Sequence, residues 1–329
     1  MAFTKSHIVL LIGMLLWPAQ NMAFAADARP NVIVIMTDDH GYGDLGCHGN
    51  KYLKTAAIDR LYSQSVRLTN YHVDPTGAAT RAALLTGRYA CRGGVWHTMM
   101  GRSLLRRDER TMADLFAEAG YRTAVFGKWH LGDNYPYRAV DRGFQESLVH
   151  GGGGIGQVSD YWGNTYFDPV LSHNGKPERQ KGYCTDIFFG KAIDFISQNR
   201  TRPFLIYLTP NVPHSPYQVP DGYTAQYVEM GLREPLAQYC GMITSLDRNM
   251  ARLLTQLDEW GLGDNTIIVL TTDNGTTGRA VDVQLRGEKG SAYEAGHRVP
   301  CFFRWPARLK GGFDVDQLTA HVDLLPTLL

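Results

Sequence analysis

Residues 72–89, HVDPTGAATRAALLTGRY, decide how the rest of this sequence is interpreted. The preceding residues, 65–73, alternate roughly between polar side chains and β-branched or aromatic ones, which is typical of a strand. A turn around Gly77 then leads into a helix that we expect to start near Thr80 and to end at Gly87. A turn between a strand and a helix N-terminus favours an anion, because free N–H groups and the helix dipole point at it.

Two long apolar runs predict buried strands that both end in oxygen-bearing side chains. Residues 31–39 (NVIVIMTDD) and 266–275 (TIIVLTTDNG) lack the polar alternation of a half-exposed strand. Ligands of α/β folds bind beyond the carboxyl ends of parallel strands. One Asp pair alone would be interpreted as turn chemistry, but the repeated layout favours a shared site for a hard cation such as Ca²⁺ or Mg²⁺. The predicted oxygen donors are Asp38, Asp39, Asp273 and Asn274.

Titratable groups follow other predicted strands. The strand at residues 122–126 leads into GKWHLG, and the strand at residues 203–208 leads into TPNVPHSP, whose histidine lies between two prolines. Taken alone, the lysine and histidine of GKWHLG would be interpreted as a surface lysine and a capping histidine. Their placement beyond strand ends favours a joint site at the same edge of the sheet. Together with a lysine in RGEKG, the candidates are Lys128, His130, His214 and Lys289.

The remaining segments predict the helix layers and one long excursion. Residues 143–182, rich in Gly and aromatic side chains, are too long for a plain connection, so we expect them to cover the functional edge. Residues 321–329 resemble the start of a helix, which favours a domain truncated at its C-terminal end. Helices are expected at residues 56–64, 111–120 with Thr111 as N-cap, 185–199 and 234–260, and a short strand at 301–305.

The composition predicts a globular chain, and the N-terminal residues predict that it is exported. Its 329 residues are 44% hydrophobic and carry a net charge of +1, so no general attraction to nucleic acid or anionic membranes is expected. Residues 1–25 predict a signal peptide, with Lys5, an apolar run at 8–17 too short to span a membrane, and a small-x-small end at 23–25. An uncleaved anchor is the alternative. We therefore expect a periplasmic or extracellular domain at residues 26–329. The five cysteines are an odd number, so at least one is free.

The order of these motifs resembles the catalytic domain of the sulfatase family over residues 31–329. The shared motifs are TDD, the turn at residues 77–88, GKWHLG, PHSP, TDNG and GxKGxxYExGxRVP. The resemblance implies an alkaline-phosphatase-like α/β fold, with a mixed, mostly parallel sheet between helix layers. We expect this chain to lack the small C-terminal antiparallel domain of the family.

The resemblance also implies roles for the site residues. The family binds Ca²⁺, with Mg²⁺ less favoured, and acts on sulfate esters of small molecules or carbohydrates. By motif position, Asp38, Asp39, Asp273 and Asn274 would bind the ion, Lys128, Lys289 and His214 would contact sulfate, and Arg81 and His130 would hold the nucleophile. Such fixed cations stabilise the negative charge that develops as a sulfate ester is cleaved.

The sequence departs from the family at the nucleophile. The family signature is C-x-P-[ST]-R, and its Cys is oxidised to formylglycine, whose hydrated aldehyde attacks sulfur. Here Gly77 takes the Cys position and Ala79 the Pro position, whereas Thr80 and Arg81 match. Gly77 has no side chain that could be oxidised to formylglycine, attack sulfur or bind the ion.

Several hypotheses follow from this departure. The chain is a pseudoenzyme that binds Ca²⁺ and sulfated ligands, or a hydrolase that uses Thr76 on a phosphoester or sulfate ester. Thr76 is more simply interpreted as a turn residue. It lies one position before the family's nucleophile, so its side chain would point in a different direction. Gly77 could also be a single-base variant of an ordinary arylsulfatase-like enzyme, which Ala79 argues against. A pure scaffold protein would not need the charged cluster.

Overall fold

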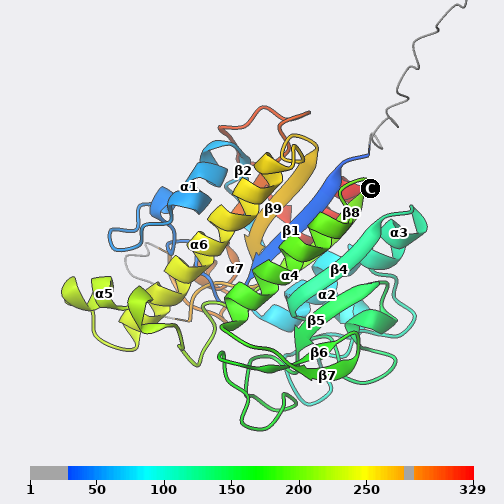
Figure 1. Ribbon diagram of the computed structural model, residues 1–329, viewed down its shortest axis with the longest axis horizontal. Helices are drawn as coiled ribbons and strands as arrows, with labels where there is room; N and C mark the ends of the chain where they lie inside the picture. The colour runs from blue at the N-terminus through cyan, green and yellow to red at the C-terminus, as the bar shows by residue number, and fades with distance from the viewer. Residues whose placement is uncertain (1–28, 278–284) are drawn as a thin grey trace, which may run out of the picture.

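The computed structural model describes residues 29–277 and 285–329 (Figure 1), so the predicted signal peptide lies outside the described residues. Its main sheet consists of β1 (Asn31–Thr37), β2 (Val66–Leu68), β4 (Arg122–Lys128), β5 (Glu146–His150), β6 (Val170–His173), β7 (Lys176–Arg179), β8 (Phe204–Thr209), β9 (Thr266–Thr272), β10 (Cys301–Arg304) and β11 (Phe313–Val315). Within the described ranges, this sheet has ten strands in the order β11-β2-β10-β9-β1-β8-β4-β5-β6-β7.

The centre of the sheet is parallel. Strands β9, β1, β8, β4 and β5 all run in one direction, and β1 pairs with β9 up to Thr37 and Thr272. Antiparallel pairs lie toward the edges, where β10 joins β9 and β6 joins β5. The predicted mixed, mostly parallel sheet is therefore confirmed, and the carboxyl ends of its central strands share one edge.

Helices cover both faces of this sheet. They are α1 (Ala56–Ser63), α2 (Gly77–Thr86), α3 (Met112–Glu118), α4 (Cys184–Gln198), α5 (Ala225–Glu229), α6 (Leu236–Glu259), α7 (Glu294–His297) and α8 (Leu324–Leu328). In Figure 1, α4 and α6 cross in front of the sheet, and together with α1 they form one layer. Helices α2, α3 and α8 pack on the other face.

The continuous apolar run of β1 is explained by these two layers. Val32, Val34 and Met36 pack in the layer of α2 and α3, whereas Ile33 and Ile35 pack in the layer of α4 and α6. Each face of the strand is covered, so neither can be polar. All seven residues of β1 and all seven of β9 are buried, as predicted.

The predicted helix N-cap at Thr111 is confirmed. The Thr111 hydroxyl accepts a hydrogen bond from the Asp114 backbone N–H, and the Asp114 carboxylate accepts one from the Thr111 N–H at 2.8 Å. This reciprocal pair is a capping box, which satisfies two free donors of the first turn.

Three local predictions were wrong in detail. Residues 65–73 form two short strands instead of one, because β3 (Tyr71–His72) leaves the main sheet and pairs with β12 (Thr319–Ala320). Helix α2 begins at Gly77 instead of near Thr80, because two alanines, which are strong helix formers, extend its first turn. Residues 143–182 also contain three strands that were not predicted, β5, β6 and β7.

Two further observations concern the cysteines and the helices of the described residues. All five cysteines are described, and none forms a disulfide. None of the helices in the ranges 29–277 and 285–329 combines the length and apolarity that crossing a bilayer requires.

Candidate functional site

The predicted oxygen donors meet at the carboxyl edge of the sheet. Because β1 and β9 are paired to their last residues, the side chains that follow Thr37 and Thr272 leave the sheet together. The Asn274 amide donates to Asp39 Oδ1 at 2.8 Å, and the Asp39 backbone N–H donates to Asp273 Oδ1 at 3.2 Å. Asp38 and Asp273 are completely buried. The structure thus brings all four predicted metal ligands into one cluster.

Three cations neutralise these carboxylates. Lys128 at the end of β4 places Nζ 2.7 Å from Asp38 Oδ1 and 3.6 Å from Asp273 Oδ2. Arg81 of α2 donates to Asp273 Oδ2 at 2.8 and 3.2 Å, and both side chains have no exposed surface. Lys289 Nζ lies 2.5 Å from Asp39 Oδ1. The cluster therefore balances three carboxylates with three fixed positive charges.

The charges shift the pKa values of the carboxyl groups in different directions. Burial raises the pKa of Asp38, and Lys128 opposes this only in part. Burial would also raise the pKa of Asp39, but His214 and Lys289 outweigh it and hold that pKa below its usual range. For Asp273, Arg81 and Lys128 overcome burial and lower the pKa strongly. Asp39 and Asp273 are therefore ionised at neutral pH.

The donor set fits a hard cation. Asp38 Oδ2 and Asn274 Oδ1 are buried and have no hydrogen-bond partner among the described residues. Leaving such oxygens unpaired is costly, and a divalent ion would satisfy both. Carboxylate and amide oxygens are the ligands that Ca²⁺ and Mg²⁺ prefer. One nitrogen, His214 Nε2, lies 3.8 Å from Asp39 Oδ2, and one possible ligand atom from each of Asp38, Asp39 and His214 lies within 4.8 Å of the others.

Gly77 lies directly over this cluster, at the first position of α2. A Cβ added at Gly77 would lie 2.3 Å from Asp273 Oδ2 and 3.6 Å from Asn274 Oδ1. The Asp273 carboxylate thus occupies the space of the side chain that Gly77 lacks. The N-cap, Thr76, has an extended backbone, and its hydroxyl makes no capping hydrogen bond within the described residues.

Two histidines face the same space. His130 Nε2–H donates to the Thr98 carbonyl at 2.8 Å, and its buried Nδ1 has no partner among the described residues. Burial and Lys128 hold the pKa of His130 well below its usual range, so this ring is neutral. His214 Nδ1–H donates to the Ser215 carbonyl at 2.6 Å, which leaves Nε2 facing Asp39.

The glycines after β5 allow the chain to approach both histidines closely. A Cβ at Gly153 would lie 2.8 Å from the His130 ring, and a Cβ at Gly154 would lie 2.9 Å from His214 Cε1. No other residue fits these positions without displacing a ring. This part of residues 143–182 does cover the functional edge, as predicted.

Backbone strain is concentrated at the same edge. Asp39 and His130 have φ values of 62° and 60°, in the left-handed region that non-glycine residues rarely adopt. Each follows the end of a central strand. Such conformations persist only where surrounding structure fixes them, and they cluster at functional sites.

A cavity of about 980 Å³ opens over the cluster. Its floor includes Thr76, Gly77, Lys128, His130, His214 and Lys289. Its rim includes the exposed side chains Met99, Met100, Tyr135 and Val158. Sequence reasoning missed this rim, because the loops at residues 98–104 and 132–137 show no periodic pattern. The only signal was a pair of adjacent methionines followed by glycine.

Comparisons with known proteins give relatives along almost the whole chain. The family model described as Sulfatase matches residues 30–329. Arylsulfatase J of Mus musculus is 29% identical over 93% of this chain and 53% of its own length. N-acetylgalactosamine-6-O-sulfatase of Bacteroides thetaiotaomicron is 32% identical over 91% of this chain and 72% of its own length.

A solved structure agrees with these sequence matches. The structure of Ps i-CgsB in complex with k-i-k-neocarrahexaose superposes with a TM-score of 0.84 at 31% identity, covering 91% of this chain and 71% of that one. The chain spans between about half and two thirds of the length of several curated relatives that it matches, 53% for arylsulfatase J and 63% for human arylsulfatase A.

Proposed function

Because this chain belongs to the sulfatase family, we propose that its site binds a sulfate ester together with Ca²⁺, without the covalent turnover of the family. The observation that carries the proposal is a complete set of charged groups beneath the cavity, next to a position without a side chain. A sulfated carbohydrate is the favoured ligand class, since one relative is by name an N-acetylgalactosamine-6-O-sulfatase. Mg²⁺ is the less favoured ion.

The ion would be held by Asp38, Asp39, Asp273 and Asn274. When bound, it would supply positive charge that neutralises the carboxylates and attracts sulfate oxygens. Once Asp38 and Asp39 are neutralised in this way, the ammonium groups of Lys128 and Lys289 are free to hold a sulfate group. Both lysines already line the cavity.

The histidines would orient the ligand. His214 presents Nε2 toward the cluster, and both His214 and His130 line the cavity in which the ligand would lie. The tautomer of each ring is fixed by the carbonyl that its other nitrogen contacts. No proton transfer to a leaving group is needed for binding alone.

Turnover is blocked at one position. Cleavage through a covalent intermediate requires a nucleophile above the cluster, and Gly77 supplies no atom beyond its backbone. Thr76 and Gly77 at the N-terminus of α2 line the cavity, and a helix N-terminus favours an anion. Binding and catalysis are thus separable in this chain.

The test is calorimetry with N-acetylgalactosamine 6-sulfate, in Ca²⁺ and after chelation, with sulfate release measured on the same mixtures. We expect binding in Ca²⁺, its loss on chelation, and no sulfate release. Lys128→Ala should weaken binding by tenfold or more, since a charge-assisted contact contributes about 1.5–3 kcal/mol. The proposal would be contradicted if no binding occurs at millimolar ligand, or if the affinity is the same with and without Ca²⁺.

A second candidate function is hydrolysis by Thr76. Its hydroxyl makes no capping hydrogen bond within the described residues, and the residue lines the cavity. Related chemistry at phosphorus would use this hydroxyl as the attacking group. A phosphoester assay on the same protein separates this candidate from the binding function.

A further inference from the structure

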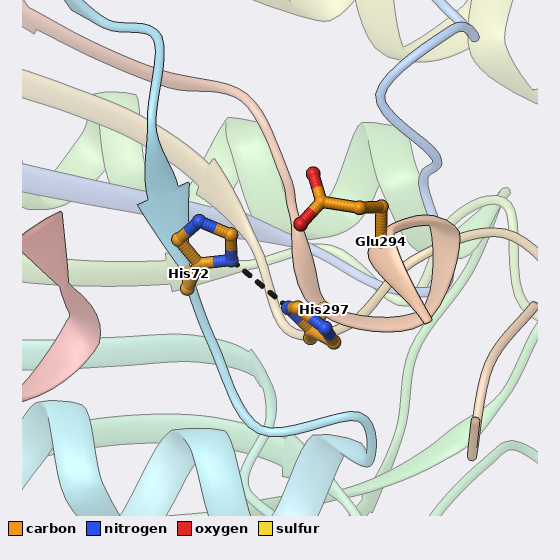
Figure 2. Close-up of side chains that lie close together, drawn as sticks. All are labelled: His72, Glu294 and His297. Atoms are coloured by element: carbon orange, nitrogen blue, oxygen red, sulfur yellow. Dashed lines mark hydrogen bonds between the residues drawn. The ribbon is translucent and has the colours of Figure 1, made fainter. Parts of the chain in front are cut away.

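A second cluster of metal-ligand side chains lies outside the cavity. His72 of β3 and His297 of α7 place their Nδ1 atoms 2.9 Å apart, and the Glu294 carboxylate lies close enough that one ligand atom from each residue falls within 4.8 Å of the others. Figure 2 shows the three side chains converging from the two segments. Among the described residues, no hydrogen bond or ion pair joins these three side chains to the oxygen donors of the cavity, so this cluster is separate.

In each histidine, Nε2 is the ring nitrogen that does not contact the other histidine. The hydrogen bond at Nε2 sets the tautomer of the ring. His72 Nε2 lies 2.8 Å from Asn70 Oδ1, and His297 Nε2 lies 3.3 Å from the Ala292 carbonyl. Both partners are oxygens that only accept, so each Nε2 carries the proton. In a neutral ring the other nitrogen then bears a lone pair. Something positive must therefore lie between the two Nδ1 atoms, either a shared proton, as in the hydrogen bond drawn in Figure 2, or a metal ion.

We propose that His72, His297 and Glu294 form a binding site for a transition-metal dication of the zinc class. Two imidazoles and one carboxylate are a known ligand set for Zn²⁺, with the fourth position open to water. Ligating histidines donate their outer N–H to an oxygen, which is the arrangement seen at both rings. Tetrahedral ligands at about 2.0–2.1 Å would lie roughly 3.3 Å apart, so the rings need to separate only slightly.

The third ligand is available at little cost. Glu294 pairs with Arg298 at 3.1 Å on the surface, where its side chain is 47% exposed. Exposed pairs of this kind contribute little, so the carboxylate can turn to an ion.

The ion would join the two segments that flank the cavity. Strand β3 leads to Thr76 and Gly77, and α7 follows the segment that carries Lys289. Backbone bonds already hold these segments together, from Val73 N–H to the His297 carbonyl at 2.9 Å and from Gly290 N–H to the Pro75 carbonyl at 2.8 Å. An ion bound by His72 and His297 would link the same two segments a second time and so stabilise the position of Lys289.

The experiment is equilibrium dialysis of the purified chain against Zn²⁺, with millimolar Ca²⁺ present to compete for the oxygen cluster. We expect one Zn²⁺ per chain, and at least a hundredfold weaker binding by the His72→Ala/His297→Ala variant. Glu294→Gln should lose about tenfold, and Asn70→Ala about tenfold through the outer hydrogen bond. His173→Ala is the matched control, because His173 pairs with Glu178 on a distant hairpin.

A second measurement does not depend on the folding of any variant. Co²⁺ added to the unaltered chain should give the intense visible absorption of a four-coordinate ion with nitrogen ligands, and Zn²⁺ should abolish it. Equal Zn²⁺ stoichiometry in the unaltered chain and the double variant would overturn the proposal. So would a weak, six-coordinate Co²⁺ spectrum, or nitrogen NMR that shows a single proton shared between the two rings in the presence of Zn²⁺.

Discussion

Two parts of the site beneath the cavity differ in their chemistry. We call the carboxyl edge of the central strands the strand wall and the N-terminus of α2 the α2 wall. The strand edge presents three carboxylates, an amide oxygen and Lys128, all almost completely buried and linked by short polar contacts. The N-terminus of α2 presents Gly77, which contributes no side chain, although Arg81 one turn later is fully engaged with Asp273. The side chains proposed to hold the ion therefore lie on one wall, and the position of the family's nucleophile lies on the other, so a change at the second leaves the first assembled.

Packing helps to explain why the strand wall is intact. A buried ion pair that loses one partner leaves an uncompensated charge, which costs several kcal/mol. Arg81, Asp273 and Lys128 form such a connected group. The nucleophile position carries no comparable constraint, because a glycine there leaves no charge unpaired. Loss of the nucleophile is thus tolerated by the fold in a way that loss of a cluster residue is not.

The largest expected effect comes from restoring the α2 wall. Gly77→Cys/Ala79→Pro, coexpressed with a formylglycine-generating enzyme, should raise sulfate release from an aryl sulfate by several orders of magnitude, because a covalent nucleophile is added to a preassembled charge cluster. Mass spectrometry of the peptide that contains position 77 checks conversion.

The matched control is Gly77→Ala. It adds the Cβ that meets Asp273 but no oxidisable group, so it reports the steric cost alone and should show no turnover. Complete conversion of the double variant without any sulfate release would mean that the strand wall is not a competent sulfate site.

The next largest effect is expected from removing the ion pair between Arg81 and Asp273, which joins the two walls. Arg81→Met should lower the free energy of unfolding by about 3–5 kcal/mol, because it leaves the Asp273 carboxylate buried without its main partner. Denaturant unfolding measures this. Arg106→Met removes the exposed pair with Asp108 and should change nothing measurable. A small loss at Arg81 would show that the two walls are not energetically joined.

A smaller effect concerns pH and the loop that supports the strand wall. Burial raises the pKa of Asp44 to about 7, although Tyr239 donates to its Oδ2 at 2.6 Å. The folded chain therefore holds a proton that the unfolded chain releases near pH 4. This contribution to stability is present at low pH and is lost between about pH 4 and pH 7, with a slope of up to about 1.4 kcal/mol per pH unit.

The check for this effect is Asp44→Asn, which mimics the protonated carboxyl. Other groups titrate identically in both proteins, so only the difference between their unfolding free energies is informative. That difference should grow in favour of the variant as pH rises from 4 to 7 and then level off. A difference that is constant over this range would place the pKa of Asp44 near its usual value.

The smallest expected effect is at the neighbour of Gly77. Thr76→Ala should leave sulfated-ligand binding unchanged, because the hydroxyl makes no capping bond that orders α2. If the chain hydrolyses a phosphoester, the same variant decides the mechanism. Phosphatase activity that survives Thr76→Ala removes the hydroxyl as nucleophile, whereas its loss at unchanged binding would give the α2 wall a chemical role.

Much of the fold and most of the site could be predicted from the sequence. The apolar runs of β1 and β9 have no polar alternation because both faces are covered, and that pattern located Asp38 and Asp273 at one edge. The start of α2 was placed too late, because the alanines after Gly77 were assigned to the turn.

Other features had a weak sequence signal or none. The Met99 and Met100 rim belongs to loops whose positions depend on tertiary contacts. The His72 and His297 pair joins residues 225 positions apart, on segments that each show only one histidine. Local patterns locate strand ends, but they do not reveal which loops meet.

The distance along the chain between the two halves of the oxygen cluster has a consequence for folding. Asp39 and Asn274 are joined by a hydrogen bond although 235 residues separate them, and β1 lies between β8 and β9, which both come much later in the sequence. A chain emerging in order must keep this buried apolar strand unpaired until these partners exist, and long-range parallel pairing is slow and prone to aggregation. We therefore expect the site to assemble late in folding, and an ion that binds there would bind only to chains that have completed this pairing.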